Sequence, residues 1–305
     1  MKSTTMRRTA LAIATATALT GLAACTSSGD SASSGKDDKA SGKDTSNLSP
    51  VAALRSAEKS TDAADSARVE STTTMGTMMS MTADGALGWD DGITGTMTIE
   101  YTGGTMADTM RQLGTTSMEA RYLPDAYYAK MGDKFAEQAG GKHWIRYDYD
   151  DLADLGGSSG AYLRDQMQNT TPNQSLKLLL ASGDVKKVGA EKVRGQETTH
   201  YSGTVDVADL AGKNSSLSAS QLADLKKQLE QAGVTTEQVD IWVDDQDLLV
   251  KKVEKGRMAT GDLTQTAYYS DYGVKISAEE PAASDTQDFK ELLEKQGGTV
   301  AGTTS

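Results

Sequence analysis

Apolar and polar residues alternate with a period of two in the region that begins at Ala67. One face of this pattern carries Val69, Ser71, Thr73, Met75, Thr77, Met79 and Met81. After a turn through Asp90, Asp91 and Gly92, one face of a second run carries Ile93, Gly95, Met97, Ile99 and Tyr101. Alternation of this kind is typical of strands with one buried face. The pattern therefore predicts strands that pair antiparallel beside a core.

Shorter runs of the same kind continue through the rest of the chain. They predict further strands at 118–123, 127–131, 144–147, 185–193, 198–207, 239–244, 248–255 and 263–272. Most of these runs are separated by short turns, and strands and helices do not alternate regularly. This arrangement favours an α+β fold with a single antiparallel sheet over a doubly wound parallel sheet.

Few segments have a helical pattern. Ser49 and Pro50 are suited to the N-cap and first position of a helix that ends near 61–65. A short helix is expected between Asn173 as its cap and Gly183 as its stop. The longest is predicted at 218–232, where a capping box precedes an apolar stripe, and its key residues are Ser218, Gln221, Leu222, Leu225 and Leu229. A last short helix is predicted at 286–295.

The N-terminal residues have the order of a bacterial export signal. Lys2, Arg7 and Arg8 precede an uncharged stretch, 9–24, which ends in Leu-Ala-Ala before Cys25. This ending resembles the lipobox of bacterial lipoproteins, a resemblance that implies diacylglycerol on the Cys25 thiol and cleavage just before it. Cys25 is the only cysteine, so it cannot form an internal disulfide. The alternative is an ordinary secretory signal in which the cysteine occurs by chance.

These features divide the chain into four parts. We expect a signal peptide at 1–24, a lipidated cysteine with a Ser-, Gly-, Asp- and Lys-rich spacer at 25–48, a folded domain at 49–296 and a flexible tail at 297–305. Loss of the three basic signal residues would change the formal net charge from -12 to near -15. Such acidity excludes nucleic-acid partners and electrostatic docking on anionic lipids. The lipid on Cys25 is then the predicted attachment to the extracytoplasmic face of the cell membrane.

Four segments in the second half of the chain carry a family resemblance. They are 185–195, 198–206, 239–253 across the Val-Asp-Ile-Trp-Val-Asp run, and 269–274 before Pro281. In this order after a lipobox they resemble the LppX/LprG group of actinobacterial lipoproteins, which is related in fold to the carriers LolA and LolB. The resemblance implies one antiparallel sheet curled into a half-barrel, with helices packed on its concave side. In several relatives the space between sheet and helices binds lipid acyl chains.

Methionine is unusually common, with thirteen residues against two phenylalanines. The predicted apolar pocket consists of residues on single faces of two strands, Met75, Met79, Met81, Met97 and Ile99. Met suits adaptable apolar surfaces, but an ordinary core is the simplest alternative. Soft-metal binding is a third, because thioethers favour Cu(I). His143 and His200 both lie outside the Met-rich segment, so no metal site is predicted, and His200 is expected to be an exposed strand residue.

The remaining motifs do not support catalysis. The sequence Gly156-Gly-Ser-Ser-Gly160 fits G-x-S-x-G without the required strand and helix around it. Asp148, Asp150, Asp151 and Asp154 lack the spacing of a calcium loop. We therefore expect no enzyme and no cofactor, but a carrier or binder of lipid or another apolar molecule. The alternative is a ligand-free interaction or envelope-sensing domain of the same fold, and nothing in the sequence specifies a protein partner.

Overall fold

The computed structural model describes residues 49–155, 171–206, 233–258 and 261–295, with residues 167, 223, 226, 227 and 230. The predicted signal peptide, the lipidated Cys25, the spacer and the tail lie outside the described residues. So do the G-x-S-x-G segment and the apolar stripe of the helix predicted at 218–232.

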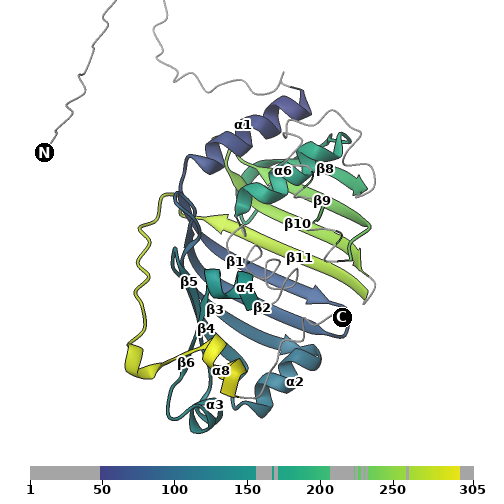
Figure 1. The fold of residues 1–305 in the computed structure, drawn as a ribbon. Coiled ribbons are helices and arrows are strands. Elements are labelled where there is room, and N and C mark those ends of the chain that lie inside the picture. The colour runs from purple at the N-terminus through teal and green to yellow at the C-terminus, as the bar shows by residue number, and fades with distance from the viewer. Residues whose placement is uncertain are drawn as a thin grey trace, which may run out of the picture. The chain divides into compact units, whose positions relative to one another are not determined.

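Twelve strands of the described part form one sheet (Figure 1). In chain order they are β1 Ser66–Met75, β2 Met79–Gly88, β3 Thr94–Gly103, β4 Ser117–Tyr122, β5 Ala126–Lys130, β6 Trp144–Asp148, β7 Lys186–Val193, β8 Gln196–Asp206, β9 Thr236–Val243, β10 Leu249–Met258, β11 Gly261–Ser270 and β12 Thr286–Asp288. Their order across the sheet is β12-β6-β5-β4-β3-β2-β1-β11-β10-β9-β8-β7. Every neighbouring pair is antiparallel except β12 and β6. The predicted α+β class with a single, mostly antiparallel sheet is confirmed. The half-barrel implied by the resemblance is not, because this sheet is not strongly curled.

The helices of the described part are α1 Pro50–Asp62, α2 Gly104–Gln112, α3 Asp133–Gln138, α4 Tyr149–Leu155, α6 Pro172–Ser182 and α8 Phe289–Lys295. As predicted, α1 begins after Ser49, whose hydroxyl accepts a hydrogen bond from the Ala52 amide at 3.2 Å. The cap predicted for α6 is wrong, because Thr171 holds that position. Asn173 lies inside the helix instead, where its amide donates to Asp62 Oδ1 at 2.6 Å and joins α6 to α1.

The first run of alternating residues, predicted as one continuous strand face, forms a hairpin of two strands. The run from Ala67 to Met81 consists of β1 and β2, which turn through residues 76–78, with Met75 opposite Met79. Gly76 adopts φ 47°, a left-handed conformation that suits glycine, and the Met78 amide closes the turn on the Met75 carbonyl at 2.9 Å. Met75 and Met79 keep the same face because they form a directly opposed pair.

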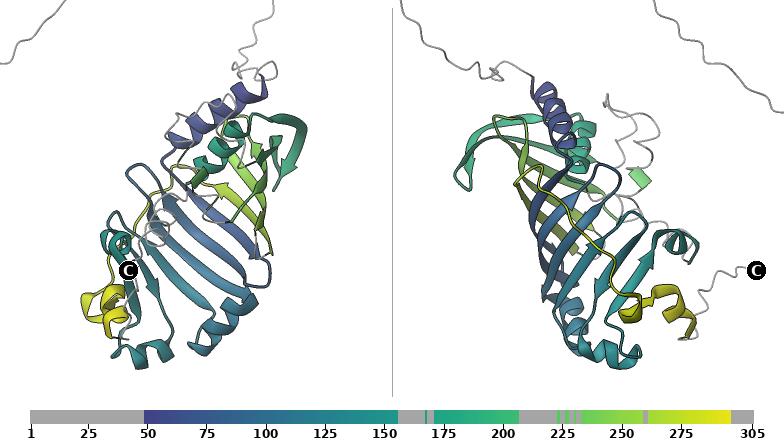
Figure 2. Two further views of the ribbon diagram at one scale, coloured as in Figure 1. Left: turned by 45° about the vertical axis from the view of Figure 1, so that its right-hand side comes forward. Right: turned by 90° about the vertical axis from the view of Figure 1, so that its left-hand side faces the viewer.

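The sheet has one covered and one more open face (Figure 2). The inner face, as we call it, packs against α1, α4 and α6, and its strand residues in the core include Val69, Met97, Ile99, Val239, Ile241 and Tyr269. Helix α6 approaches β8 so closely that a Cβ on Gly203 would lie 2.7 Å from Leu179 Cδ1. On the opposite, outer face, Arg68, Glu70 and Thr72 of β1 are exposed. The alternation predicted from the sequence thus separates core from solvent.

The two edge strands differ in length and chemistry. Edge strand β7 carries Lys186, Lys187 and Lys192, and its pairing with β8 shifts register between Lys187 and Gly189. Edge strand β12 has only three residues. These occupy 286–288, so α8 begins three residues later than the predicted helix.

Candidate functional site

The five residues predicted to form a pocket lie together on the inner face of β1, β2 and β3. Met75 lies opposite Met79, and Met97 and Ile99 lie opposite Gly85 and Ala83. Their burial differs, since Met97 and Ile99 are in the core while the three other methionines are half-buried. The structure therefore brings the two Met-containing runs into one continuous surface, which we call the Met surface.

Short side chains lie between the long ones on the Met surface. Ala267, Ser71 and Ala83 form one row across β11, β1 and β2, and Ile99 continues it on β3. The next row places Met81 opposite Tyr101. Alanine and serine rise little above the sheet, so this part of the inner face is lower than the Met and Tyr side chains beside it. At Gly85 the space is filled, because a Cβ there would lie 2.8 Å from the Met97 sulfur.

Aromatic side chains extend the apolar surface toward β6. Ring centroids are 5.0 Å apart for Tyr122 and Tyr127, 5.7 Å for Tyr127 and Tyr147, and 4.7 Å for Tyr147 and Phe289. Burial raises the pKa of Tyr122 and of Tyr147 to about 12. The Tyr149 hydroxyl is buried and has no hydrogen-bond partner in the described part of the chain. The phenols at this end of the inner face therefore remain neutral.

A charged cluster lies on the inner face of β9 and β10, next to α6. Lys252 Nζ donates to Ser175 Oγ and to Glu254 Oε2, both at 2.9 Å, and Ser175 Oγ donates to Glu254 Oε1 at 2.5 Å. Only 10% and 12% of the Lys252 and Glu254 side chains is exposed. Glu237 completes what we call the Lys252 cluster, and burial, followed by the charge of Glu254, raises the pKa of Glu237 to about 8.

The charge of Lys252 is maintained despite its burial. Burial lowers the pKa of the amine, but the nearby carboxylate of Glu254 more than offsets this and holds the pKa above its ordinary value. Sequence reasoning missed this cluster. A register shift between Leu249 and Lys251 moves both Lys252 and Glu254 to the inner face, and no residue in the run marks that shift.

The two histidines lie away from the Met surface. His143 Nδ1 lies 2.7 Å from Asp285 Oδ1 next to β6. The expected exposure of His200 is wrong, because its ring stacks on Trp242 with centroids 4.2 Å apart and its Nε2 lies 2.9 Å from Asp240 Oδ1. Only 15% of the His200 side chain is exposed.

The acidic segment at 148–154 begins a helix. Asp148 accepts the backbone amides of Asp150 and Asp151 at 2.9 and 3.0 Å, and lies 2.7 Å from an Arg146 nitrogen. Asp151 is paired with Lys290 at 2.7 Å. Within the described ranges, no group of three or more His, Cys, Asp or Glu side chains is arranged to hold a metal ion.

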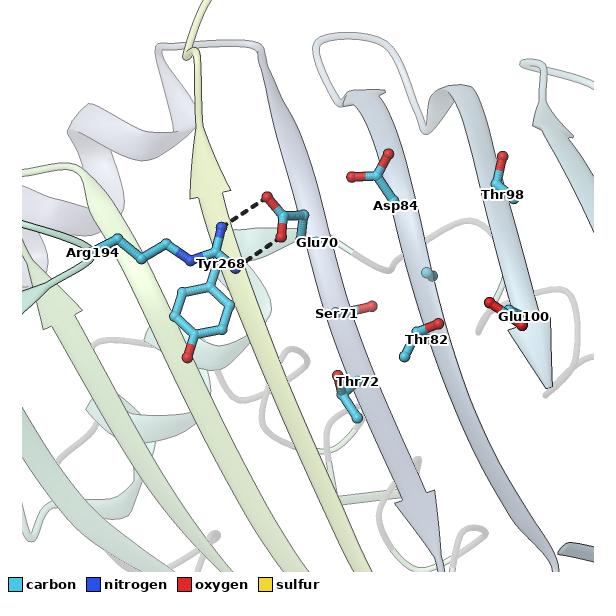
Figure 3. A pocket seen from close by; sticks show the side chains of 10 residues that line it. Glu70, Ser71, Thr72, Thr82, Asp84, Thr98, Glu100, Arg194 and Tyr268 are labelled. Atoms are coloured by element: carbon cyan, nitrogen blue, oxygen red, sulfur yellow. Dashed lines mark hydrogen bonds and ion pairs between the residues drawn. The ribbon is translucent and has the colours of Figure 1, made fainter. Parts of the chain in front are cut away.

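A polar groove of about 440 Å³ lies on the outer face (Figure 3). Its lining residues are Glu70, Ser71, Thr72, Thr82, Ala83, Asp84, Thr98, Glu100, Arg194 and Tyr268. Arg194, at the tip of the β7–β8 hairpin, donates to both oxygens of Glu70 at 2.7 and 2.8 Å and lies 3.9 Å from the Tyr268 ring centre. These contacts fasten the hairpin to β1 and β11, which gives this corner of the groove a structural role.

Comparisons with known proteins identify relatives from Streptomyces. The chain is 54% identical over 310 residues to a Streptomyces coelicolor protein named "Putative lipoprotein", and the alignment covers 97% of this chain and 100% of that one. It is 61% identical over 261 residues to an "Uncharacterized 31.2 kDa protein" encoded between rplA and rplJ in Streptomyces griseus, with 85% of each chain covered. The chain belongs to the family of these Streptomyces proteins. No family model matches it.

Solved structures with low sequence identity also match. The lipoprotein LppX of Mycobacterium tuberculosis has a TM-score of 0.45 at 13% identity, covering 75% of this chain and 98% of that one. LprF from Mycobacterium bovis has a TM-score of 0.42 at 16% identity, covering 77% and 97%. The resemblance predicted from the sequence is confirmed, and alignments at this level do not establish a shared ligand. None of the helices in the described part is long and apolar enough to cross a membrane.

Proposed function

We propose that this chain is a lipoprotein of the extracytoplasmic face of the cell membrane, and that its inner face binds lipid or another apolar molecule. One observation supports the ligand most directly. Two separate Met-containing runs meet on one surface, where small residues leave a low strip between long, flexible side chains. Met adapts its shape to irregular apolar partners. The ligand would lie between this surface and the helices that cover the inner face.

The anchor in this proposal is diacylglycerol on Cys25. A lone cysteine after Leu-Ala-Ala supports it, as does the name of the Streptomyces coelicolor relative. Two acyl chains hold a protein stably in a membrane, whereas one chain holds it only marginally. We expect Cys25→Ser to abolish incorporation of a fatty-acid label and to release the protein from the membrane fraction. Equal labelling of the variant and the parent chain would contradict the anchor.

The ligand site is tested by changing the Met surface without changing side-chain length. Met79→Gln with Met97→Gln places two amides on an apolar surface, and each unpaired amide costs about 1–3 kcal/mol. We expect retention of N-phenyl-1-naphthylamine, an uncharged apolar fluorescent probe, to fall more than the melting temperature does. Met78→Gln is the matched control, because Met78 is exposed in the turn between β1 and β2. Unchanged retention in a folded double variant would contradict this site.

The alternative function is a ligand-free interaction or envelope-sensing domain. The filled space above Gly85 and the burial of Met97 and Ile99 favour it, because they indicate core packing on part of the same face. Native mass spectrometry distinguishes the two functions. Lipid that co-purifies with the chain supports a carrier, whereas a bare protein from a lipid-rich host supports the interaction domain.

A further inference from the structure

The inner face changes from polar to apolar along single rows of the sheet. One row begins at Glu254 on β10, continues through Gln265 and Thr73 on β11 and β1, and ends at Met81 and Tyr101 on β2 and β3. Figure 1 shows β10, β11, β1 and β2 side by side in this order. Gln265 Nε2 donates to Thr73 Oγ1 at 3.3 Å, so the polar character extends to the border of the Met surface.

A neighbouring row also changes from a polar residue at one end to apolar residues at the other. It runs from Glu237 on β9 through Gly256 and Leu263 to the pair Met75 and Met79. Adjacent strands lie about 4.8 Å apart, so the four strand steps from β9 to β2 separate Glu237 from Met79 by about 19 Å. Val234 packs against this row at Gly256, where a Cβ would lie 3.4 Å from Val234 Cγ1. A molecule that spans the row would therefore cross Val234 between the carboxyl group and the methionines.

Among the described residues of the Lys252 cluster, Glu237 interacts with Lys252 through charge alone and not through a hydrogen bond. The residue is only 6% exposed, and among the described residues its carboxyl group makes no hydrogen bond. Two donors of Lys252 are already used by Glu254 and Ser175. Buried carboxylates are normally paired, because an unpaired one loses its hydration without compensation. The cluster holds two carboxyl groups against one amine, which leaves Glu237 as the surplus acid.

The charge balance of the cluster indicates the ligand class. A cationic group beside Glu237 would supply the missing partner, and its attraction would favour the ionised carboxylate. An anionic group would meet two carboxyl groups, with the only amine already committed to one of them. A neutral group would gain a hydrogen bond but no charge compensation.

We propose that the inner face binds an amphiphile lengthwise, with a protonated amine of its headgroup against Glu237 and its apolar tail over Met75 and Met79. This inference rests on the proposed function, since it assigns the headgroup of a ligand bound at the same face. Neither the Met surface nor the Lys252 cluster alone specifies how the ligand is oriented. Its orientation follows from the two rows of residues that connect them.

Three amphiphiles with one chain length test the headgroup. Dodecylamine, dodecanol and dodecanoate are each used at pH 7 to displace N-phenyl-1-naphthylamine from the purified full chain carrying Cys25→Ser. We expect dodecylamine to compete about tenfold better than dodecanoate, a ratio equivalent to about 1.4 kcal/mol. Glu237→Gln should remove most of this preference while leaving competition by dodecanol unchanged.

Glu100→Gln is the matched control, because it makes the same Glu-to-Gln exchange at an exposed position on β3. The preference for the amine should persist in it. Equal competition by dodecanoate, or a preference that survives Glu237→Gln in a folded variant, would overturn the headgroup assignment while dodecanol binding still supports the proposed function. Failure of all three amphiphiles to displace the probe would overturn the proposed function as well.

Discussion

The two faces of the sheet each carry an ion pair, and the pairs differ in exposure. On the inner face, 10% and 12% of the Lys252 and Glu254 side chains is exposed. On the outer face, 49% and 50% of the Arg194 and Glu70 side chains is exposed, although the contact is bidentate and as short as 2.7 Å. Solvent screens the outer pair, while the inner pair depends on its hydrogen bonds to offset lost hydration. Contact distance therefore does not indicate which pair matters more for stability.

The largest effect should come from removing one partner of the inner pair. Lys252→Met keeps much of the side-chain volume but leaves the buried carboxylate of Glu254 without its amine. Breaking a buried pair in this way costs about 3–5 kcal/mol, and we expect the free energy of unfolding in urea to fall by that amount.

The double variant Lys252→Met with Glu254→Leu separates charge from packing. It removes both ions and leaves similar volume, and such replacements are often neutral or stabilising. Recovery of most of the lost stability would assign the loss to the unpaired charge. A double variant that is less stable than Lys252→Met would contradict the comparison.

The next effect should appear in the dependence of stability on pH, where it is spread over several pH units. Burial raises the pKa of Glu237 to about 8 from its ordinary 4.5, so the folded chain retains a proton that the unfolded chain releases. The stability that this retained proton contributes is fully present below pH 4.5 and is lost as the pH rises to about 8. Between these values the Glu237 contribution to unfolding free energy should fall by up to about 1.4 kcal/mol per pH unit. Denaturation across this range should show a flatter profile for Glu237→Gln, and parallel profiles would contradict the assignment.

The smallest effect is expected at the outer pair. Arg194→Ala removes both hydrogen bonds to Glu70, but exposed pairs contribute about 1 kcal/mol or less. We expect that loss to shrink further at high salt, whereas the effect of Lys252→Met should persist. If Arg194→Ala lowered the free energy of unfolding as much as Lys252→Met does, the attachment of the β7–β8 hairpin would govern stability instead.

Local patterns predicted most of the strands, including β4–β11, because alternation against a core is visible in the sequence itself. The turn at residues 76–78 was missed because Met, Thr and Gly continue the alternation through it. The Met surface was predicted as a set of shared faces, and its ligand-binding role stays a prediction. The Lys252 cluster could not be predicted, since a register shift on β10 reverses which residues face inward. Such a shift depends on pairing with β9 and not on composition.

The unequal edges of the sheet have a consequence for self-association. A sheet of twelve strands ends in two rows of unsatisfied backbone groups, and a long, flat, apolar edge would recruit another copy. Here one edge offers three residues, and the other carries three lysines and an irregular register that interrupts a continuous ladder. Copies crowded on one surface would find no long, regular edge among the described strands on which to pair. The wide sheet can therefore remain monomeric at densities where an unprotected one would polymerise.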